Sequence, residues 1–169
     1  MRRVLLAVAL VVAGLLTYAA PAAAAPYCGI EWGSGPKAVS TYGTGEVDNI
    51  RTGRHDCWDR VVVEVDGPAA GYRAEYVDTV HADGSGAVVA VPGGAKIRLI
   101  VNHPASTLGP VGSSQANVSG YSTLRSVVNA GSFEGQTTIG VGTRARLPFR
   151  VFVLQGGHGR IVLDVAHRW

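Results

Sequence analysis

The chain has 169 residues, with 15 Lys+Arg, 12 Asp+Glu and a formal net charge of +3 at pH 7. A chain of this length is of one-domain size and can bury a sizeable core. Its small excess of positive charge is no evidence for nucleic-acid binding, which usually needs a clustered basic face, and we expect no nucleic-acid partner.

The first residues have the pattern of an export signal. Two arginines precede an apolar run from Val4 to Leu16, and small residues follow from Ala19 to Ala25. The apolar run is shorter than the roughly 20 residues that a membrane-spanning helix needs, although a retained anchor is the alternative. We predict a signal peptide at residues 1–24, cleaved after Ala24, and a secreted or extracytoplasmic protein without a stable membrane span after cleavage.

Cys28 and Cys57 are the two cysteines of the chain. In an exported protein they most simply form one disulfide, and two free thiols or a catalytic cysteine are the alternative. Residues 25–52 are rich in Gly, Ser, Pro and Thr and have weak apolar periodicity. We therefore expect this segment to be an extended arm, tied back by the disulfide.

Residues 53–169 have the alternating pattern of short β-strands. The expected strands are residues 60–65, 71–77, 88–91, 96–101, 122–128, 137–141, 148–154 and 160–166. Pro92-Gly-Gly94 predicts a hairpin between two of them, and residues 103–120 have the composition of a long loop. The fold class is therefore all-β, a single-domain β-sandwich of about eight short strands with a disulfide-stapled N-terminal arm.

A cluster of polar residues precedes the first of these strands. His55, Asp56 and Asp59 with nearby arginines could act as a general base and hold an anion. Ion pairs and turn hydrogen bonds that anchor the strand are the structural alternative. The sequence has no Gly-x-Ser-x-Gly elbow and no histidine pair at metal-ligand spacing. We therefore expect no catalytic residue, no metal and no cofactor.

Aromatic residues in loops give a second indication of function. An exposed ring in such a segment could stack on a sugar, or it could cover an end of the sandwich. These residues are Trp32, Tyr42, Trp58 and Tyr121. We expect Glu134 to pair with an arginine, either in the interior or at the edge of a sheet. The candidate ligand-binding residues are Arg51, Arg54, His55 and Trp58.

Several short motifs follow one another in a characteristic order. They are Cys28–Ser34 (CGIEWGS), Arg51–His55 (RTGRH), Cys57–Arg60 (CWDR), Ala130–Gly135 (AGSFEG), Leu147–Phe152 (LPFRVF) and Leu163–His167 (LDVAH). In the sequence and order of these motifs, the chain resembles the AMIN-like domain of secreted actinobacterial proteins. The resemblance implies a β-sandwich related to the AMIN module, which is a non-catalytic targeting domain associated with peptidoglycan and the cell envelope.

Three functions are compatible with these observations. The first is an exported, non-catalytic module that binds a cell-envelope component, with cell-wall glycan or peptidoglycan as the expected partner. The second is a secreted protein-binding module such as a protease inhibitor, which would use the loop at residues 103–120. The third is a hydrolase that works through His55 and Asp59.

Overall fold

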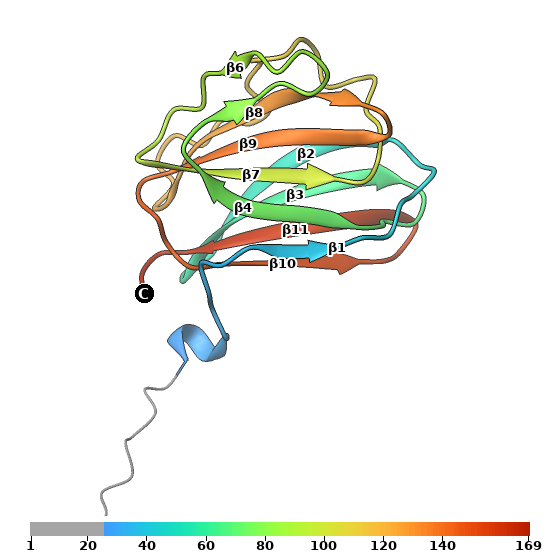
Figure 1. Ribbon diagram of the computed structural model, residues 1–169. Helices are drawn as coiled ribbons and strands as arrows, with labels where there is room; N and C mark the ends of the chain where they lie inside the picture. The colour runs from blue at the N-terminus through green and yellow to red at the C-terminus, as the bar shows by residue number, and fades with distance from the viewer. Residues whose placement is uncertain (1–25) are drawn as a thin grey trace, which may run out of the picture.

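The computed structural model describes residues 26–169, which form two β-sheets packed face to face (Figure 1). The predicted signal peptide, residues 1–24, lies outside the described residues. Among residues 26–169, no helix is long and apolar enough to cross a membrane.

The described chain is almost entirely β-structure. It contains the 3₁₀ turn η1 (Tyr27–Gly29) and the strands β1 (Lys37–Val39), β2 (Val47–Arg54), β3 (Trp58–Asp66), β4 (Tyr72–Val77), β5 (Val80–His81), β6 (Val88–Val89), β7 (Ala95–Val101), β8 (Leu124–Phe133), β9 (Gln136–Thr143), β10 (Phe149–Leu154) and β11 (His158–Ala166). One sheet has the order β1-β4-β7-β9-β8, the other has the order β10-β11-β3-β2, and β5 pairs with β6. The prediction of an all-β sandwich is confirmed, with more strands than expected.

The core lies between the two sheets and follows the alternation of the strands. On β3, Val61, Val63 and Val65 are fully buried in the core, whereas Arg60 and Glu64 point to the other face. Successive side chains of a strand point to opposite faces, so every second residue of the four-stranded sheet faces outward. Burying a valine of this kind contributes roughly 1.5–3 kcal/mol.

The segment that we expected to be an extended arm contributes a strand to each sheet. β1 pairs with β4, and β2 pairs with β3 along its whole length. Val47 and Ile50 of β2 belong to the core. A β-bulge between Val47 and Asn49 shifts the register of β2. This shift breaks the period-two pattern, and it explains why the sequence shows no strand there.

The hairpin predicted at Pro92-Gly-Gly94 does not form. β6 pairs with β5, whereas β7 lies between β4 and β9. Gly94 instead allows the backbone to pass close to that of Arg144, because a Cβ on Gly94 would lie 2.2 Å from the carbonyl oxygen of Arg144.

Residues 103–120 contain no strand, as predicted, and residues 112–115 lie along the outer edge of β8. Gln115 donates its backbone N–H to the Val127 carbonyl at 2.8 Å, and Asn129 donates to the Ser113 carbonyl at 3.0 Å. On the other side of the sandwich, Phe149 of the edge strand β10 donates its backbone N–H to the Gly33 carbonyl at 2.9 Å. Both sides of the sandwich are thus partly closed by segments outside the main strands.

Candidate functional site

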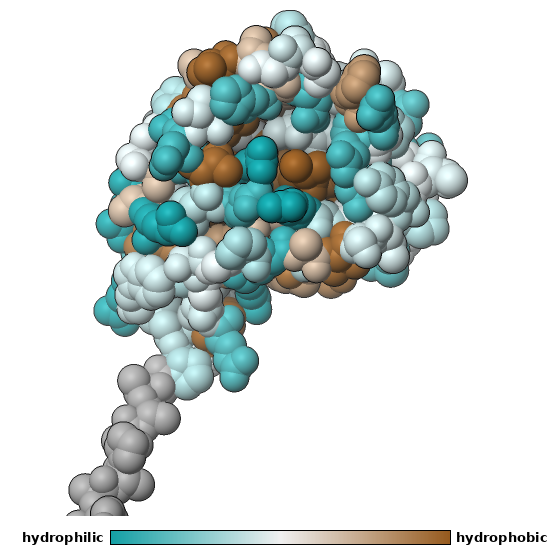
Figure 2. Space-filling model, in the orientation of Figure 1, coloured by the Kyte–Doolittle hydropathy of each residue, from teal (hydrophilic) through white to brown (hydrophobic). Residues whose placement is uncertain are grey.

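The outward face of the five-stranded sheet is largely occupied by its own side chains. The segment that carries β5 and β6 packs its valines on β8 and β9, and Val91 lies directly over Gly140. Glu75 accepts hydrogen bonds from both Arg73 and Arg98. Figure 2 shows hydrophilic side chains at the middle of this side of the molecule, with hydrophobic patches beside them. Glu75 is thus shared by two arginines, and the Nε atom of Arg98 is buried without a hydrogen-bond partner.

The outward face of the four-stranded sheet is rich in arginine. Its register places three rows of residues side by side from β2 to β10: Gly53–Arg60–Asp164–Arg150, Arg51–Val62–Val162–Phe152 and Asn49–Glu64–Arg160–Leu154. We call this surface, together with Arg54 and His55 at the end of β2, the arginine face. Val62 and Val162 are buried although they point outward, and they line the same hollow as Arg51, Arg60 and Arg160.

A buried carboxylate organises the centre of the arginine face. Asp164 is fully buried and accepts two hydrogen bonds from Arg60, at 2.6 and 2.9 Å, and one from Nε of Arg150 at 2.9 Å. The hydrogen bond to Asp164 raises the pKa of Arg60 above its ordinary value. Both guanidinium groups are therefore fixed in position.

Aromatic rings continue the arginine face toward the N-terminal segment. His55 stacks on Trp58 with 4.9 Å between ring centroids, and Trp58 lies 6.2 Å from Trp32. The guanidinium of Arg150 lies 5.5 Å from the ring of Trp32 and 5.4 Å from that of Trp58, within cation–π range. Rings and guanidinium groups thus alternate across this part of the surface.

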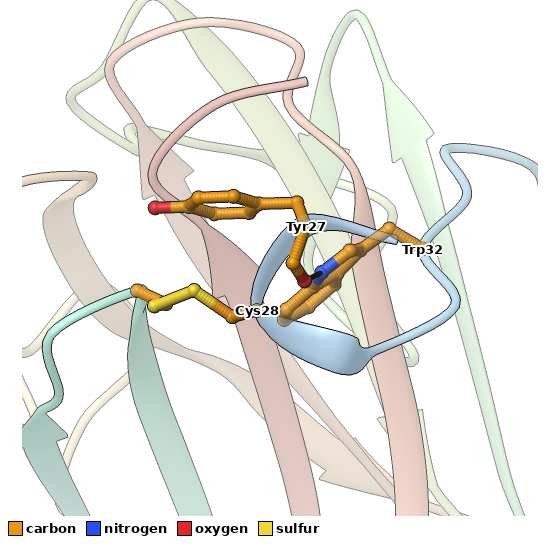
Figure 3. Close-up of a disulfide and its surroundings, with 4 residues drawn as sticks. Tyr27, Cys28 and Trp32 are labelled. Carbon is orange, nitrogen blue, oxygen red and sulfur yellow. Dashed lines mark hydrogen bonds between the residues drawn. A yellow bond between two sulfur atoms is a disulfide. The ribbon is translucent and has the colours of Figure 1, made fainter. Parts of the chain in front are cut away.

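The disulfide Cys28–Cys57 places Trp32 beside Trp58. Figure 3 shows the disulfide, with Tyr27 and Trp32 next to it. The indole N–H of Trp32 donates to the backbone carbonyl of Tyr27 at 2.8 Å, which fixes the ring orientation. The predicted pairing of the two cysteines is confirmed, and it carries an aromatic side chain onto the arginine face.

A hollow of about 310 Å³ lies at the β2 side of the arginine face. Its lining contains Arg51, Arg54, His55, Arg60 and Arg160 around Gly53, with Val62, Val162 and Leu154 as apolar surface. Arg51 pairs with Glu64 at 2.8 Å, whereas Arg54 donates only to the Gly120 carbonyl, at 3.3 Å. No carboxylate contributes to the lining of this hollow among residues 26–169.

The four residues predicted to bind a ligand lie together in the structure. Arg51, Arg54 and His55 line the hollow, and Trp58 stacks on His55. Their role in binding stays a prediction. Arg150 and Arg160, which come from the last two strands, were not among the residues predicted from the sequence. Their alternation with core residues marks them as outward-facing, but only the strand register shows that they lie on the same face of the sheet as Arg51 of β2.

His55 and Asp59 do not form the pair that a hydrolase would need. Asp59 points to the opposite side of β3, where it is buried and accepts hydrogen bonds from the backbone N–H groups of Thr123, at 2.5 Å, and Leu124, at 3.0 Å. Its other oxygen lies 3.1 Å from Nε2 of His167. Asp59 therefore anchors the start of β8 and the C-terminal segment to β3.

Three other residues singled out in the sequence lie apart from the arginine face. The Tyr121 hydroxyl lies 3.0 Å from Oγ1 of Thr52, and the exposed Tyr42 hydroxyl accepts a hydrogen bond from Gln136. Glu134 is exposed and has no arginine partner among residues 26–169, contrary to the expectation. It forms the two-residue β8–β9 turn with Gly135, where both residues have positive φ.

A larger groove of about 1030 Å³ runs between residues 112–121 and β8. Its polar lining includes Gln115, Asn117, Ser119, Tyr121 and Arg125. Gly120 of this groove accepts a hydrogen bond from the guanidinium of Arg54, which lines the hollow.

Acid is expected to destabilise the protein in part through the ion pair at the edge of this face. Hydrogen bonds from Arg51 and Asn49 lower the pKa of Glu64 below its ordinary value. A carboxylate with a lowered pKa stabilises the fold above its unfolded-state pKa, and this contribution is lost as the pH falls through the folded-state value. The free energy of unfolding should therefore decrease below about pH 4.3, and less steeply in Glu64→Gln. Urea unfolding at a series of pH values measures how the free energy of unfolding changes with pH. If this free energy falls as steeply below about pH 4.3 in Glu64→Gln as in the unmodified protein, the prediction is wrong.

Comparison with known families identifies the sandwich. The family model of the AMIN-like domain matches residues 45–167. The match begins just before β2 and ends just after β11, so it contains the whole four-stranded sheet. Neither a curated protein nor a solved structure matches the chain. The chain therefore belongs to the AMIN-like domain family.

Proposed function

We propose that this protein is an exported, non-catalytic module that binds cell-wall glycan or peptidoglycan through its arginine face. Membership of the AMIN-like family indicates a binding or targeting module associated with the cell envelope, rather than a catalytic domain. The intramolecular disulfide is consistent with an extracytoplasmic location, because structural disulfides persist in oxidising compartments.

The observation that carries the proposal is the alternation of rings and guanidinium groups on an uncovered sheet face. Trp32, Trp58 and His55 form a continuous set of rings, with Arg150 between the two indoles. The C–H face of a pyranose is apolar and packs on an aromatic ring, while guanidinium groups bind the hydroxyls and carboxylates at its rim. A polymer of amino sugars that bears carboxylates offers both kinds of contact.

The groove beside β8 favours an extended ligand over a compact one. Its side chains are mostly hydroxyl and amide groups, which suit the hydroxyl and acetamido groups of a glycan chain. Gly120 of the groove lies within hydrogen-bond distance of Arg54 of the hollow, so a long ligand in the groove would have its end close to Arg54.

Trp58→Ala is expected to weaken the binding of the purified protein to purified bacterial cell walls roughly thirtyfold. Truncating a central aromatic residue in a binding surface typically costs about 2 kcal/mol or more. Co-sedimentation over a range of wall concentrations measures the change. Because Trp58 is half-buried, His55→Ala is the second variant, since it removes an exposed ring from the same stack.

Tyr42→Ala is the matched control, because it removes an exposed ring outside the arginine face. It should bind walls as the unmodified protein does. If the unmodified protein sediments no better with walls than an unrelated secreted protein, the proposed function is wrong. Equal retention of Trp58→Ala, His55→Ala and the unmodified protein would exclude the arginine face as the binding surface.

A further inference from the structure

A second hollow, of about 420 Å³, lies where the N-terminal segment meets the last residues of the chain. Most of its lining residues carry rings, and we call it the aromatic hollow: Tyr27, Trp32, Pro148 and Trp169, with the carboxylate of Glu31 beside them. Its volume is within the range of small-molecule sites, roughly 300–1,000 Å³. Trp32 joins it to the arginine face, because its ring lies 5.5 Å from the guanidinium of Arg150.

The walls of the aromatic hollow are held together at one residue, Cys57. The disulfide Cys28–Cys57 holds the segment that carries Trp32 next to the start of β3 (Figure 3). His167 donates its backbone N–H to the carbonyl of Cys57 at 2.9 Å, which brings the segment that ends in Trp169 to the same place. Both ends of the described chain are therefore fixed where the hollow lies.

The ring of Trp169 is available to a ligand. Among residues 26–169 it is the most exposed large hydrophobic side chain, at 71%. It belongs to neither hydrophobic cluster, so the packing of the sandwich does not depend on it. An aromatic side chain buries roughly 150–250 Å² when it is fully covered, so a flat apolar surface placed on this ring would be stabilised by the hydrophobic effect.

The charges around the aromatic hollow favour an uncharged ligand. Glu31 is exposed and lines the hollow, and the guanidinium of Arg168 lies 4.7 Å from the centroid of the Tyr27 ring. Neither Glu31 nor Arg168 makes an ion pair among residues 26–169. A cationic ligand would meet Arg168 and an anionic ligand would meet Glu31. Hydroxyl groups can donate to the carboxylate and accept from the guanidinium, so a neutral ligand with hydroxyls uses both.

A pyranose ring has this combination of an apolar C–H face and a rim of hydroxyl groups. We infer that the aromatic hollow binds an uncharged sugar of the wall glycan, which stacks on Trp169 while Glu31 accepts hydrogen bonds from its hydroxyl or acetamido groups. This inference rests on the proposed function and adds a subsite for a neutral sugar beside the arginine face.

Tri-N-acetylchitotriose is the probe for this subsite, because this trimer of N-acetylglucosamine carries no charge. The chain has three tryptophans, Trp32, Trp58 and Trp169, so each indole N–H signal can be followed in ¹H–¹⁵N NMR. Titration of the purified protein with the trimer should shift the signals of Trp169 and Trp32 more than that of Trp58. Trp169→Ala should weaken binding about tenfold or more, because it removes the stacking ring, and Glu31→Gln should weaken it severalfold.

Each variant has a matched control outside the aromatic hollow. Tyr42→Ala removes an exposed ring, and Glu134→Gln neutralises an exposed carboxylate at the β8–β9 turn, so neither should change binding of the trimer. Because Trp169 and Glu31 are exposed, their variants should unfold at the same urea concentration as the unmodified protein. Unchanged affinity in Trp169→Ala, a largest shift at Trp58, or tighter binding of a proline-rich peptide than of the trimer would overturn the inference.

The same measurements separate this inference from the proposed function. If walls retain the protein but the trimer does not bind, the neutral-sugar subsite is wrong and wall binding stands. If the trimer binds at Trp169 but walls do not retain the protein, the subsite stands and the proposed function fails.

Discussion

Asp164→Ala is expected to lower the free energy of unfolding by about 3–5 kcal/mol, the cost of removing one partner from a buried ion pair. Asp164 is fully buried, and Arg60 and Arg150 both depend on it for a counter-charge. The substitution leaves two guanidinium groups side by side with their shared acceptor missing. Each also lies near the ring of Trp58, so the loss should extend to the aromatic part of the arginine face.

Urea unfolding followed by circular dichroism measures the stability change. Glu64→Ala is the control, because it removes a carboxylate from a partly exposed pair with Arg51, and exposed pairs are worth about 0–1 kcal/mol. A loss below about 1 kcal/mol in Asp164→Ala would mean that water replaces the carboxylate easily, and that the pairing does not organise the face.

Replacing both cysteines with serine is expected to lower the free energy of unfolding by about 3–4 kcal/mol. The disulfide closes a loop with a sequence separation of 29, and in the chain-entropy model a link of this length stabilises by that amount. Both cysteines are replaced together so that no free thiol remains. The Cys28→Ser, Cys57→Ser double variant should also release Trp32 from Trp58, because the disulfide holds the N-terminal segment beside β3.

The unmodified protein in reducing agent is the reference for this experiment. It should unfold at the same urea concentration as the double variant, and Trp fluorescence should report the separation of the two indoles in both. A double variant as stable as the oxidised protein would show that β1 and the Gly33–Phe149 contact hold the segment without the disulfide.

The strands that the sequence predicted are those with an uninterrupted period of two. β3 and β11 alternate between core and outward positions, so their pattern identifies them without knowledge of their partners. β2 was missed because its bulge breaks the period. The false hairpin at Pro92-Gly-Gly94 has the composition of a turn, but the glycines there serve a close approach to Arg144 that only the folded chain reveals.

The candidate site was predictable only where its residues are close in sequence. Arg51, Arg54, His55 and Trp58 lie within eight positions of one another at the β2–β3 hairpin, so local composition identifies them as a group. Arg150 and Arg160 join them through the pairing of β3 with β11 and of β11 with β10. Such pairing depends on the register between distant strands, which the hydrophobic pattern of one strand does not contain.

The edges of both sheets are built in a way that discourages strand addition by another molecule. Residues 113–115 cover part of the β8 edge, and Gly33 pairs with Phe149 at the β10 edge. β1 has three residues, and β2 carries a bulge together with Asp48, Arg51 and Arg54. Short, bulged, charged or covered edges are the devices by which β-proteins avoid edge-to-edge aggregation. A sandwich with this many strands can therefore remain dispersed at high local concentration, as accumulation on a surface would require.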